Sequence, residues 1–312
     1  MMMSDLRNSV YLLFSLTVIL VCGCSETIEH GDSGVLVSTD WLQDHLKDPD
    51  LILLHAGTAD FYDSIHIPGA RLILPSEFTM ETVELNNEIP PVDSLQEVLR
   101  SVGVNQGSRI VLYCQSASLL SRTARIYVTL EHLGLGERTY FLNGGLPAWQ
   151  EEERELTDLV PEVRPGNLEL TGLKQVVIES AELDRQRWSD TVVVLDVRSD
   201  EEYYGTPESE EGPAEGGHIE GAYFLPYRDL LVEDSIYMYK PDSELQGLFR
   251  KAGVDAGKRT VVYCGSGIRA SVSYLAARHL GYPVMLYDGS YEEWSGLDLP
   301  LTGPVARPDE NE

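Results

Sequence analysis

Short runs of apolar residues alternate with amphipathic segments along most of the chain. Four such runs occupy residues 51–54, 110–113, 192–195 and 261–263. Their length is typical of strands that are buried on both faces of a parallel sheet. Between the runs, apolar residues recur at helical spacing, as in residues 272–280, where Gly281 supplies the expected C-terminal stop. The pattern predicts an α/β fold in which small parallel sheets carry helices on both faces.

One sequence unit occurs twice. Residues 104–114 match residues 254–264 at an offset of 150 positions, and both segments end on Tyr-Cys. Three further pairs of matching segments follow in the same order: residues 66–70 and 218–222, 131–134 and 278–281, and 143–149 and 288–294. Such a long unit indicates a duplicated domain rather than a solenoid, whose repeats are about 20–50 residues long. The two tandem domains are placed at residues 35–153 and 173–303. The polar linker between them covers residues 154–172, and the tail covers residues 304–312.

The N-terminal segment carries a short apolar run before two cysteines. The run covers residues 10–21, and its twelve residues are too few to span a bilayer, which needs roughly 20. We therefore expect residues 1–23 to be a secretory signal. Residues 21–24 resemble a bacterial lipobox, which implies lipidation of Cys24, a tether over residues 24–34 and a periplasmic, outer-membrane location favoured by Ser25. The alternative is an uncleaved membrane anchor.

Composition and charge narrow the classes of partner. The chain has 312 residues, of which 43% are hydrophobic and 24% charged, an ordinary globular composition. Its formal net charge of −28 repels phosphate backbones, so no nucleic acid partner is expected. An anionic small substrate would need a local positive pocket. Four cysteines are too few for a disulfide scaffold, so their placement matters more than their number.

Cys264 lies where a buried strand ends and a helix begins. Ligands of parallel α/β sheets bind beyond the carboxyl ends of the strands. A helix N-terminus at that point offers unpaired N–H groups and a positive dipole potential, which lower the pKa of a thiol and make it nucleophilic. In residues 264–269, here called the Cys264 loop, two glycines let successive N–H groups face the sulfur, and Arg269 adds forked donors for an oxyanion.

Four ordered segments carry a family resemblance. The Cys-x-x-Gly-x-Arg loop at 264–269 and residues 195–199, 217–222 and 287–294 together resemble the rhodanese family. The resemblance covers about residues 35–303. It implies a thiosulfate or 3-mercaptopyruvate sulfurtransferase with ping-pong chemistry. The Cys264 thiolate attacks the outer sulfur of the donor and releases sulfite or pyruvate, and the persulfide then passes to cyanide or a thiol acceptor. No metal and no organic cofactor is implied.

The predicted site residues follow from the loop and from the resemblance. Cys264 is the expected catalytic residue, and the expected substrate-binding residues are Gly265, Ser266, Gly267, Ile268, Arg269 and Arg198. For Arg198, an internal ion pair with Asp196 is at least as strong a hypothesis as substrate contact. Ser266 either donates to the substrate oxyanion or satisfies a loop carbonyl.

Two pairs of repeated residues invite a functional and a structural interpretation. His66 and His218 occupy the same repeat position, and we expect structural hydrogen bonds rather than catalysis. Trp149 and Trp294 are expected to be core or lid residues.

The first copy departs from the loop pattern. Arg122 lies eight positions after Cys114 instead of five, the intervening segment lacks glycine, and His55 stands opposite Asp196 of the second copy. The resemblance implies an inactive first domain. Three hypotheses remain for Cys114: a relic, a second thiol that accepts sulfur or pairs with another cysteine, or part of an enlarged anion pocket of phosphatase type.

Two signals conflict over the sulfur donor. Residues 264–267 look like the mercaptopyruvate-type loop, whereas Arg269 fits the cationic rim suited to the thiosulfate dianion. Residues 200–205 are acidic and lack the arginine that would clamp a mercaptopyruvate carboxylate. We favour thiosulfate, with 3-mercaptopyruvate as the alternative, and we expect the acidic insert at 206–217 to flank the pocket.

Two rival classes remain. A non-catalytic sulfur-carrier or partner-binding lipoprotein would keep the fold without turnover. A phosphatase or arsenate reductase is disfavoured, because the six-residue span of the Cys264 loop is one residue shorter than phosphatase-type loops of this fold.

Overall fold

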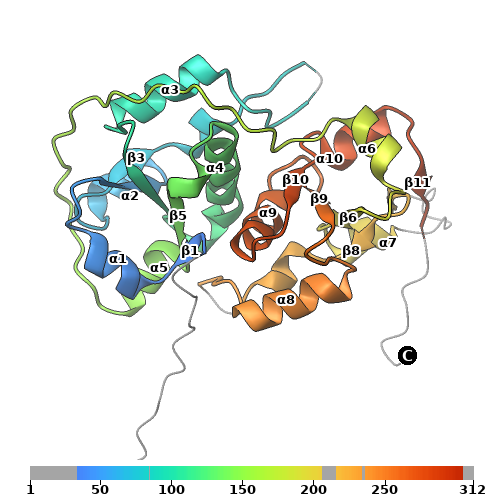
Figure 1. Cartoon of the computed structure of the whole chain (residues 1–312). Helices are drawn as coiled ribbons and strands as arrows, with labels where there is room; N and C mark the ends of the chain where they lie inside the picture. The colour runs from blue at the N-terminus through green and yellow to red at the C-terminus, as the bar shows by residue number, and fades with distance from the viewer. Residues whose placement is uncertain (1–33, 84, 206–215, 234–235, 305–312) are drawn as a thin grey trace, which may run out of the picture.

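The computed structural model describes residues 34–83, 85–205, 216–233 and 236–304 (Figure 1). The predicted signal segment with Cys24, most of the acidic insert and most of the tail lie outside the described residues. No helix in the described ranges is long and apolar enough to cross a membrane.

The first domain is built around one parallel sheet. Its strands are β1 (Leu36–Val37), β2 (Leu51–Ala56), β3 (Arg71–Ile73), β4 (Arg109–Cys114) and β5 (Thr139–Leu142). Its helices are α1 (Thr39–His45), α2 (Ala59–Ser64), α3 (Val92–Ser101), α4 (Leu120–His132) and α5 (Gly145–Glu151), with 3-10 turns η1 (Pro75–Phe78), η2 (Ala117–Leu119) and η3 (Gly136–Arg138). The strand order is β1-β5-β4-β2-β3, and every pairing is parallel.

The second domain repeats this architecture. Its strands are β6 (Val192–Asp196), β7 (His218–Ile219), β8 (Tyr223–Phe224), β9 (Arg259–Tyr263), β10 (Val284–Leu286) and β11 (Leu301–Thr302). Its helices are α6 (Ser180–Gln186), α7 (Asp200–Tyr204), α8 (Asp242–Lys251), α9 (Ala270–His279) and α10 (Ser290–Gly296), with the 3-10 turn η4 (Tyr227–Leu230). The parallel order β10-β9-β6-β8 matches that of the first domain, and β7 and β11 form a small antiparallel pair.

The duplication predicted from the sequence is therefore confirmed in three dimensions. Even the edge strand has a counterpart, because Val177 bridges Leu286 in parallel as β1 pairs with β5. The predicted apolar runs form the central strands, and successive residues along them enter different cores. In β2, for example, Leu53 packs in the cluster formed with α1, α2 and α5, whereas Ile52 and Leu54 pack on the opposite face.

The two domains share one hydrophobic cluster. Helix α4 packs against α9 where the domains meet (Figure 1), and buried residues of both helices and both sheets belong to the same cluster. Polar contacts border it: Arg278 Nε donates to Glu131 Oε1 at 2.7 Å, and the Leu36 N–H donates to His279 Nδ1 at 3.3 Å. The domain interface is thus a continuous core with a polar rim.

Candidate active site

Cys264 occupies the step between β9 and α9, at the carboxyl end of the sheet. The residue is 1% exposed. Its loop is fixed by the start of α10: the Cys264 N–H donates to Ser290 Oγ at 3.2 Å, and the Tyr291 N–H donates to the Cys264 carbonyl at 3.0 Å. The Glu292 N–H similarly donates to the Gly265 carbonyl at 3.0 Å. The loop carbonyls near the sulfur therefore point toward α10 and are satisfied there.

Gly267 is required by the shape of this loop. Its φ is +81°, a conformation that L side chains rarely adopt. A Cβ at this position would lie 2.5 Å from Asp288 Oδ1 and 2.8 Å from the Asp288 carbonyl oxygen. The sequence prediction that glycine lets the backbone curl here is consistent with both the torsion angle and the close approach of Asp288.

The five backbone N–H groups that follow Cys264 in its loop are unpaired in the described part of the chain. Among the residues that the structure describes, none accepts a hydrogen bond from the N–H groups of residues 265–269. They lie in the loop that leads into the ten-residue helix α9, where the helix dipole favours negative charge. Such a set of unpaired donors suits a thiolate, a persulfide or a substrate oxyanion.

Arg269 is held by a carboxylate that the sequence analysis did not single out. Its Nη1 and Nη2 each donate to one oxygen of Glu202, both at 2.6 Å. Burial alone would raise the pKa of Glu202, but the hydrogen bonds from Arg269 and from the Ser199 N–H outweigh it and lower the pKa to about 2. The cationic rim expected from Arg269 is thus neutralised by α7. The only signal in the sequence for Glu202 was its position in the acidic segment at residues 200–205.

Arg198 forms the internal ion pair proposed from the sequence. Its Nη2 donates to Asp196 Oδ2 and to the Gly217 carbonyl, both at 2.6 Å, and the residue is 3% exposed. The Tyr263 hydroxyl also donates to Asp196 Oδ2, at 2.7 Å. The guanidinium carbon lies 4.0 Å from the centre of the Tyr291 ring. These contacts brace β6 against β9 and α10, and substrate contact by Arg198 stays a prediction.

The first domain contributes residues that sequence reasoning missed. Asn87 Nδ2 donates to both the carbonyl and the hydroxyl oxygen of Ser266, each at 3.2 Å. Arg125, which is fully buried, pairs through both terminal nitrogens with the carboxylate of Asp288. These contacts join residues that are distant in sequence. The only signal in the sequence was the repeat alignment. It sets Asp288 opposite Asn143 and so marks the segment around Asp288 as recurrent.

Cys114 lies in a different environment from Cys264. It ends β4, is 2% exposed, and burial raises the pKa of its thiol to about 12. A Cβ at Gly145 would lie 2.5 Å from its Sγ, so the sulfur is closely covered. Arg122 is exposed on α4 whereas Cys114 is buried, which argues against the phosphatase-type hypothesis. The raised pKa of the thiol and the close cover by Gly145 favour the relic, and a second thiol stays a prediction.

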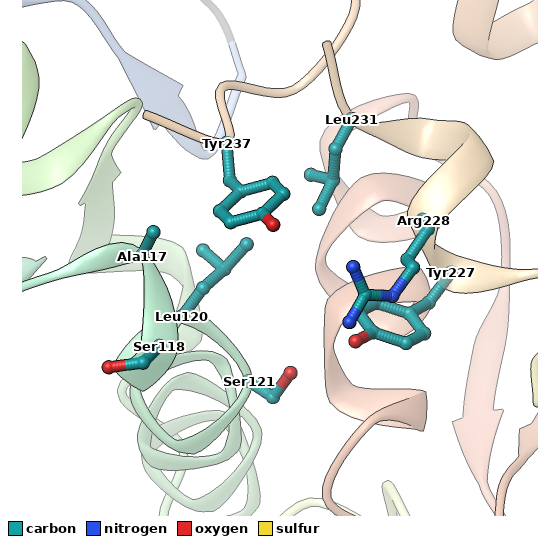
Figure 2. A pocket seen from close by; sticks show the side chains of 8 residues that line it. All are labelled: Ala117, Ser118, Leu120, Ser121, Tyr227, Arg228, Leu231 and Tyr237. Atoms are coloured by element: carbon teal, nitrogen blue, oxygen red, sulfur yellow. The ribbon is translucent and has the colours of Figure 1, made fainter. Parts of the chain in front are cut away.

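A cavity of about 440 Å³ lies between the domains at this degenerate loop (Figure 2). It is lined by η2 and the start of α4 on one side and by η4 and Tyr237 on the other. Figure 2 shows the Arg228 guanidinium and the Ser121 hydroxyl directed toward the space between them. No residue of the Cys264 loop is among those that line it.

The repeated histidines and tryptophans have structural roles. His66 Nδ1 lies 2.7 Å from the Tyr62 carbonyl and His218 Nδ1 lies 3.1 Å from the Tyr203 carbonyl, and each ring stacks on that tyrosine. Both tryptophans are fully buried and donate to backbone carbonyls, which confirms their assignment to the core.

His55 replaces an acid in the first domain. It contacts the Tyr113 hydroxyl at 2.8 Å, as Asp196 contacts Tyr263 in the second domain. Burial, the largest effect, lowers the pKa of His55 to about 4.

No group of three or more His, Cys, Asp or Glu side chains in the described ranges is arranged to hold a metal ion.

Comparison with known proteins identifies relatives over most of the chain. A family model described as "Rhodanese-like domain" matches residues 38–152 and 179–297. The 3-mercaptopyruvate sulfurtransferase of Escherichia coli K12 is 28% identical over 277 residues, which are 85% of this chain and 96% of that protein. The sulfur carrier protein TtuD of Thermus thermophilus is 31% identical over 293 residues, covering 88% and 98% of the two chains.

Further similarities agree with these. The thiosulfate sulfurtransferase of Azotobacter vinelandii is 29% identical over 262 residues, covering 83% of this chain and 94% of that protein. The crystal structure of the 3-mercaptopyruvate sulfotransferase SseA from Escherichia coli superposes with a TM-score of 0.69 at 27% identity. It covers 83% of this chain and 99% of that one.

Proposed function

The chain belongs to the rhodanese family, and we propose that it is a sulfurtransferase that takes a sulfane sulfur from thiosulfate and carries it as a persulfide on Cys264. The single observation that carries the proposal is the Cys264 loop: no described residue accepts a hydrogen bond from the five consecutive N–H groups that follow Cys264, the residue directly after β9. This arrangement stabilises anionic sulfur without a metal.

The reaction proceeds in two displacements at sulfur. In the first, the Cys264 thiolate attacks the outer sulfur of thiosulfate, the new S–S bond forms, and the old S–S bond breaks with its electron pair leaving on sulfite. In the second, cyanide or a thiolate attacks the outer sulfur of the persulfide and the cysteine leaves as thiolate. Both steps place negative charge beside the loop N–H groups, so the same donors assist both.

The charges around the loop support thiosulfate as donor. Residues 200–205 contain no arginine to bind the carboxylate of 3-mercaptopyruvate, and the guanidinium of Arg198 is engaged by Asp196. Arg269 places forked donors at the end of the loop, but its charge is compensated there by Glu202. The pairing of Arg269 with Glu202, and the mercaptopyruvate enzyme among the relatives, make 3-mercaptopyruvate the second candidate donor.

The test is steady-state thiocyanate formation from cyanide with each donor. Wild type, Cys264→Ser and Cys114→Ser are compared, with Cys114 as the matched control because it ends the equivalent strand of the first domain. Activity lost only in Cys264→Ser, with a higher kcat/KM for thiosulfate, is the expected result. Full activity in Cys264→Ser, or a wild type inactive with both donors, contradicts the mechanism. A gain of one sulfur in mass on Cys264 without thiocyanate would instead identify a carrier.

We further propose that the protein is a periplasmic lipoprotein tethered to the outer membrane through Cys24. The support is in the sequence alone: the short apolar run at residues 10–21, the lipobox-like residues 21–24 and the following Ser25. Mass spectrometry of the mature N-terminus tests this. A diacylglyceryl-modified Cys24 is expected in wild type and is lost in Cys24→Ala, whereas an intact N-terminus would indicate an uncleaved anchor.

A further inference from the structure

The first domain reaches the Cys264 loop through the side-chain amide of Asn87. Asn87 lies in a segment closed by paired backbone hydrogen bonds of 2.9 Å between Met80 and Glu88. Its φ is +63°, a backbone conformation that residues other than glycine uncommonly adopt and that asparagine tolerates. Its Nδ2 donates to the carbonyl and hydroxyl oxygens of Ser266, at 3.2 Å each. A carbonyl only accepts, so the atom facing it is the amide nitrogen.

A buried cation keeps Asn87 in this position. Arg125 Nη2 donates to the Asn87 carbonyl at 2.6 Å, and the same guanidinium binds both carboxylate oxygens of Asp288. Asp288 in turn lies directly behind Gly267, and a Cβ on Gly267 would be only 3.3 Å from Arg125 Nη1. One side chain of α4 therefore fixes both the residue that contacts Ser266 and the residue that backs Gly267.

The contact determines which way the Ser266–Gly267 peptide faces. In a planar trans peptide the carbonyl and the following N–H point in opposite directions. Because the Ser266 carbonyl points to Asn87, the Gly267 N–H points away from Asn87. That N–H is one of the loop donors without an acceptor in the described protein.

The contact also determines the polarity of the Ser266 hydroxyl. The Asn87 amide nitrogen only donates, so the hydroxyl oxygen accepts from it and retains its own proton for another acceptor. No residue in the described part of the chain accepts that proton. The hydroxyl is therefore left as a donor for an anion bound at the loop.

We propose that Asn87 is a positioning residue of the sulfur-transfer reaction. It orients the Gly267 N–H and the Ser266 hydroxyl as donors toward the anionic sulfur species. Arg125 holds Asn87 in this position. The inference rests on the proposed sulfurtransferase activity and extends it. The first domain, whose own cysteine is buried, thus completes the anion-binding loop of the second domain.

The neighbouring residue provides a matched control. Asn86 Nδ2 donates to Glu292 Oε1 at 2.8 Å, so it also crosses the domain interface with a side-chain amide, but it binds a residue of α10 and not one of the Cys264 loop. Asn86→Ala removes a contact of the same kind, and Asn87→Ala and Asn87→Asp change the proposed one. Ser266→Ala removes the hydroxyl alone.

The experiment uses the full chain and two independent readouts. The first is thiocyanate formation with thiosulfate, resolved into kcat and KM. The second, which needs no turnover, is the ratio of the rate constants for alkylation of Cys264 by iodoacetate and by iodoacetamide, since an anion-binding loop favours the anionic reagent. Thermal unfolding of each variant reports whether the fold is retained.

We expect Asn87→Ala to lower kcat/KM for thiosulfate about tenfold, the effect of losing about one hydrogen bond to a charged group, and to lower the alkylation ratio. Asn87→Asp is expected to have a larger effect, because a carboxylate accepts the Ser266 proton. Asn86→Ala should stay within about twofold of wild type. When Asn87→Ala is added to Ser266→Ala, it should lower kcat/KM less than it does in wild type. The hydroxyl is already absent in that variant, so only the orientation of the peptide can be lost.

Three results would overturn the inference. The first is that the Asn87 variants keep the wild-type kcat/KM and alkylation ratio. The second is that they lose thermal stability while neither readout changes. The third is that Asn86→Ala and Asn87→Ala change kcat/KM equally. If wild type itself forms no thiocyanate with either donor, the proposed function fails. The alkylation ratio then still decides whether Asn87 orients an anion-binding loop.

Discussion

Replacing Glu202 by glutamine tests whether the Glu202–Arg269 pair limits the positive charge offered to the donor. The substitution keeps the size of the side chain and leaves Arg269 as an uncompensated cation at the end of the Cys264 loop. A cation near a bound anion contributes a binding free energy proportional to the charge of that anion, and KM falls accordingly. We therefore expect Glu202→Gln to lower KM for the thiosulfate dianion more than for the 3-mercaptopyruvate monoanion.

The magnitude follows from the strength of the pair. The pKa of Glu202 falls from its ordinary 4.5 to about 2, which at about 1.36 kcal/mol per pKa unit would correspond to about 3 kcal/mol. The side chains are 33% and 36% exposed, so solvent screening reduces the free energy to about 1 kcal/mol. One kcal/mol is about fivefold in an equilibrium constant. We expect a roughly fivefold lower KM for thiosulfate and about a twofold lower KM for 3-mercaptopyruvate.

The assay is thiocyanate formation at low and high ionic strength, with Asp200→Asn as control. Asp200 is an exposed carboxylate two residues away that makes the same change in net charge. The Glu202→Gln effect should shrink at high salt, and Asp200→Asn should have little effect. A higher KM, or equal changes for both donors, would refute the argument and indicate that the pair mainly holds the loop.

The same pair predicts a pH dependence of stability. The folded-state pKa of Glu202 is depressed, so its stabilisation is present above the unfolded value of 4.5 and is lost as the pH falls through about 2. In urea denaturation, the difference between wild type and Glu202→Gln should therefore be constant from pH 7 to about 5 and should close below it.

Three further outcomes are expected. Because burial raises the pKa of Cys114 to about 12, alkylation of the native protein at pH 8 with peptide mapping should modify Cys264 at least about tenfold faster than Cys114; equal rates would contradict this. Gly267→Ala should abolish most thiocyanate formation, because a Cβ at Gly267 would lie 2.5 Å from Asp288 Oδ1. Gly257→Ala should not, because Gly257 has a negative φ. The pKa of buried His55 is lowered to about 4, so unfolding free energy should fall by up to about 3 kcal/mol as the pH drops from 6.5 to 4; an unchanged pH profile in His55→Gln would rule this group out.

The sequence was sufficient to predict the fold because its signals are local and repeated. Apolar runs of strand length recur at matching positions in both halves, and each became a central strand. The Cys264 loop could be placed for the same reason, since its residues are contiguous and lie between a strand and a helix. Local spacing was enough to set Cys264 beside the N–H groups of its own loop.

The partners of that loop could not be predicted in this way. Asn87 lies 179 positions from Ser266, and Arg125 lies 163 positions from Asp288. Which side chains meet across the α4–α9 interface depends on how two domains dock, and neither spacing nor residue type contains that information. Glu202 shows a related limit: an acidic segment was correctly noted, but its effect on Arg269 depends on α7 facing the loop.

The shared hydrophobic cluster has a consequence for how the protein loses its structure. Because buried side chains of both halves belong to one cluster, each half would expose part of its apolar core once the other melts. The duplicated chain should therefore denature in one cooperative transition, not two. A protease cut in the 154–172 linker should leave the halves associated, since the covalent connection contributes little compared with the buried surface that joins them.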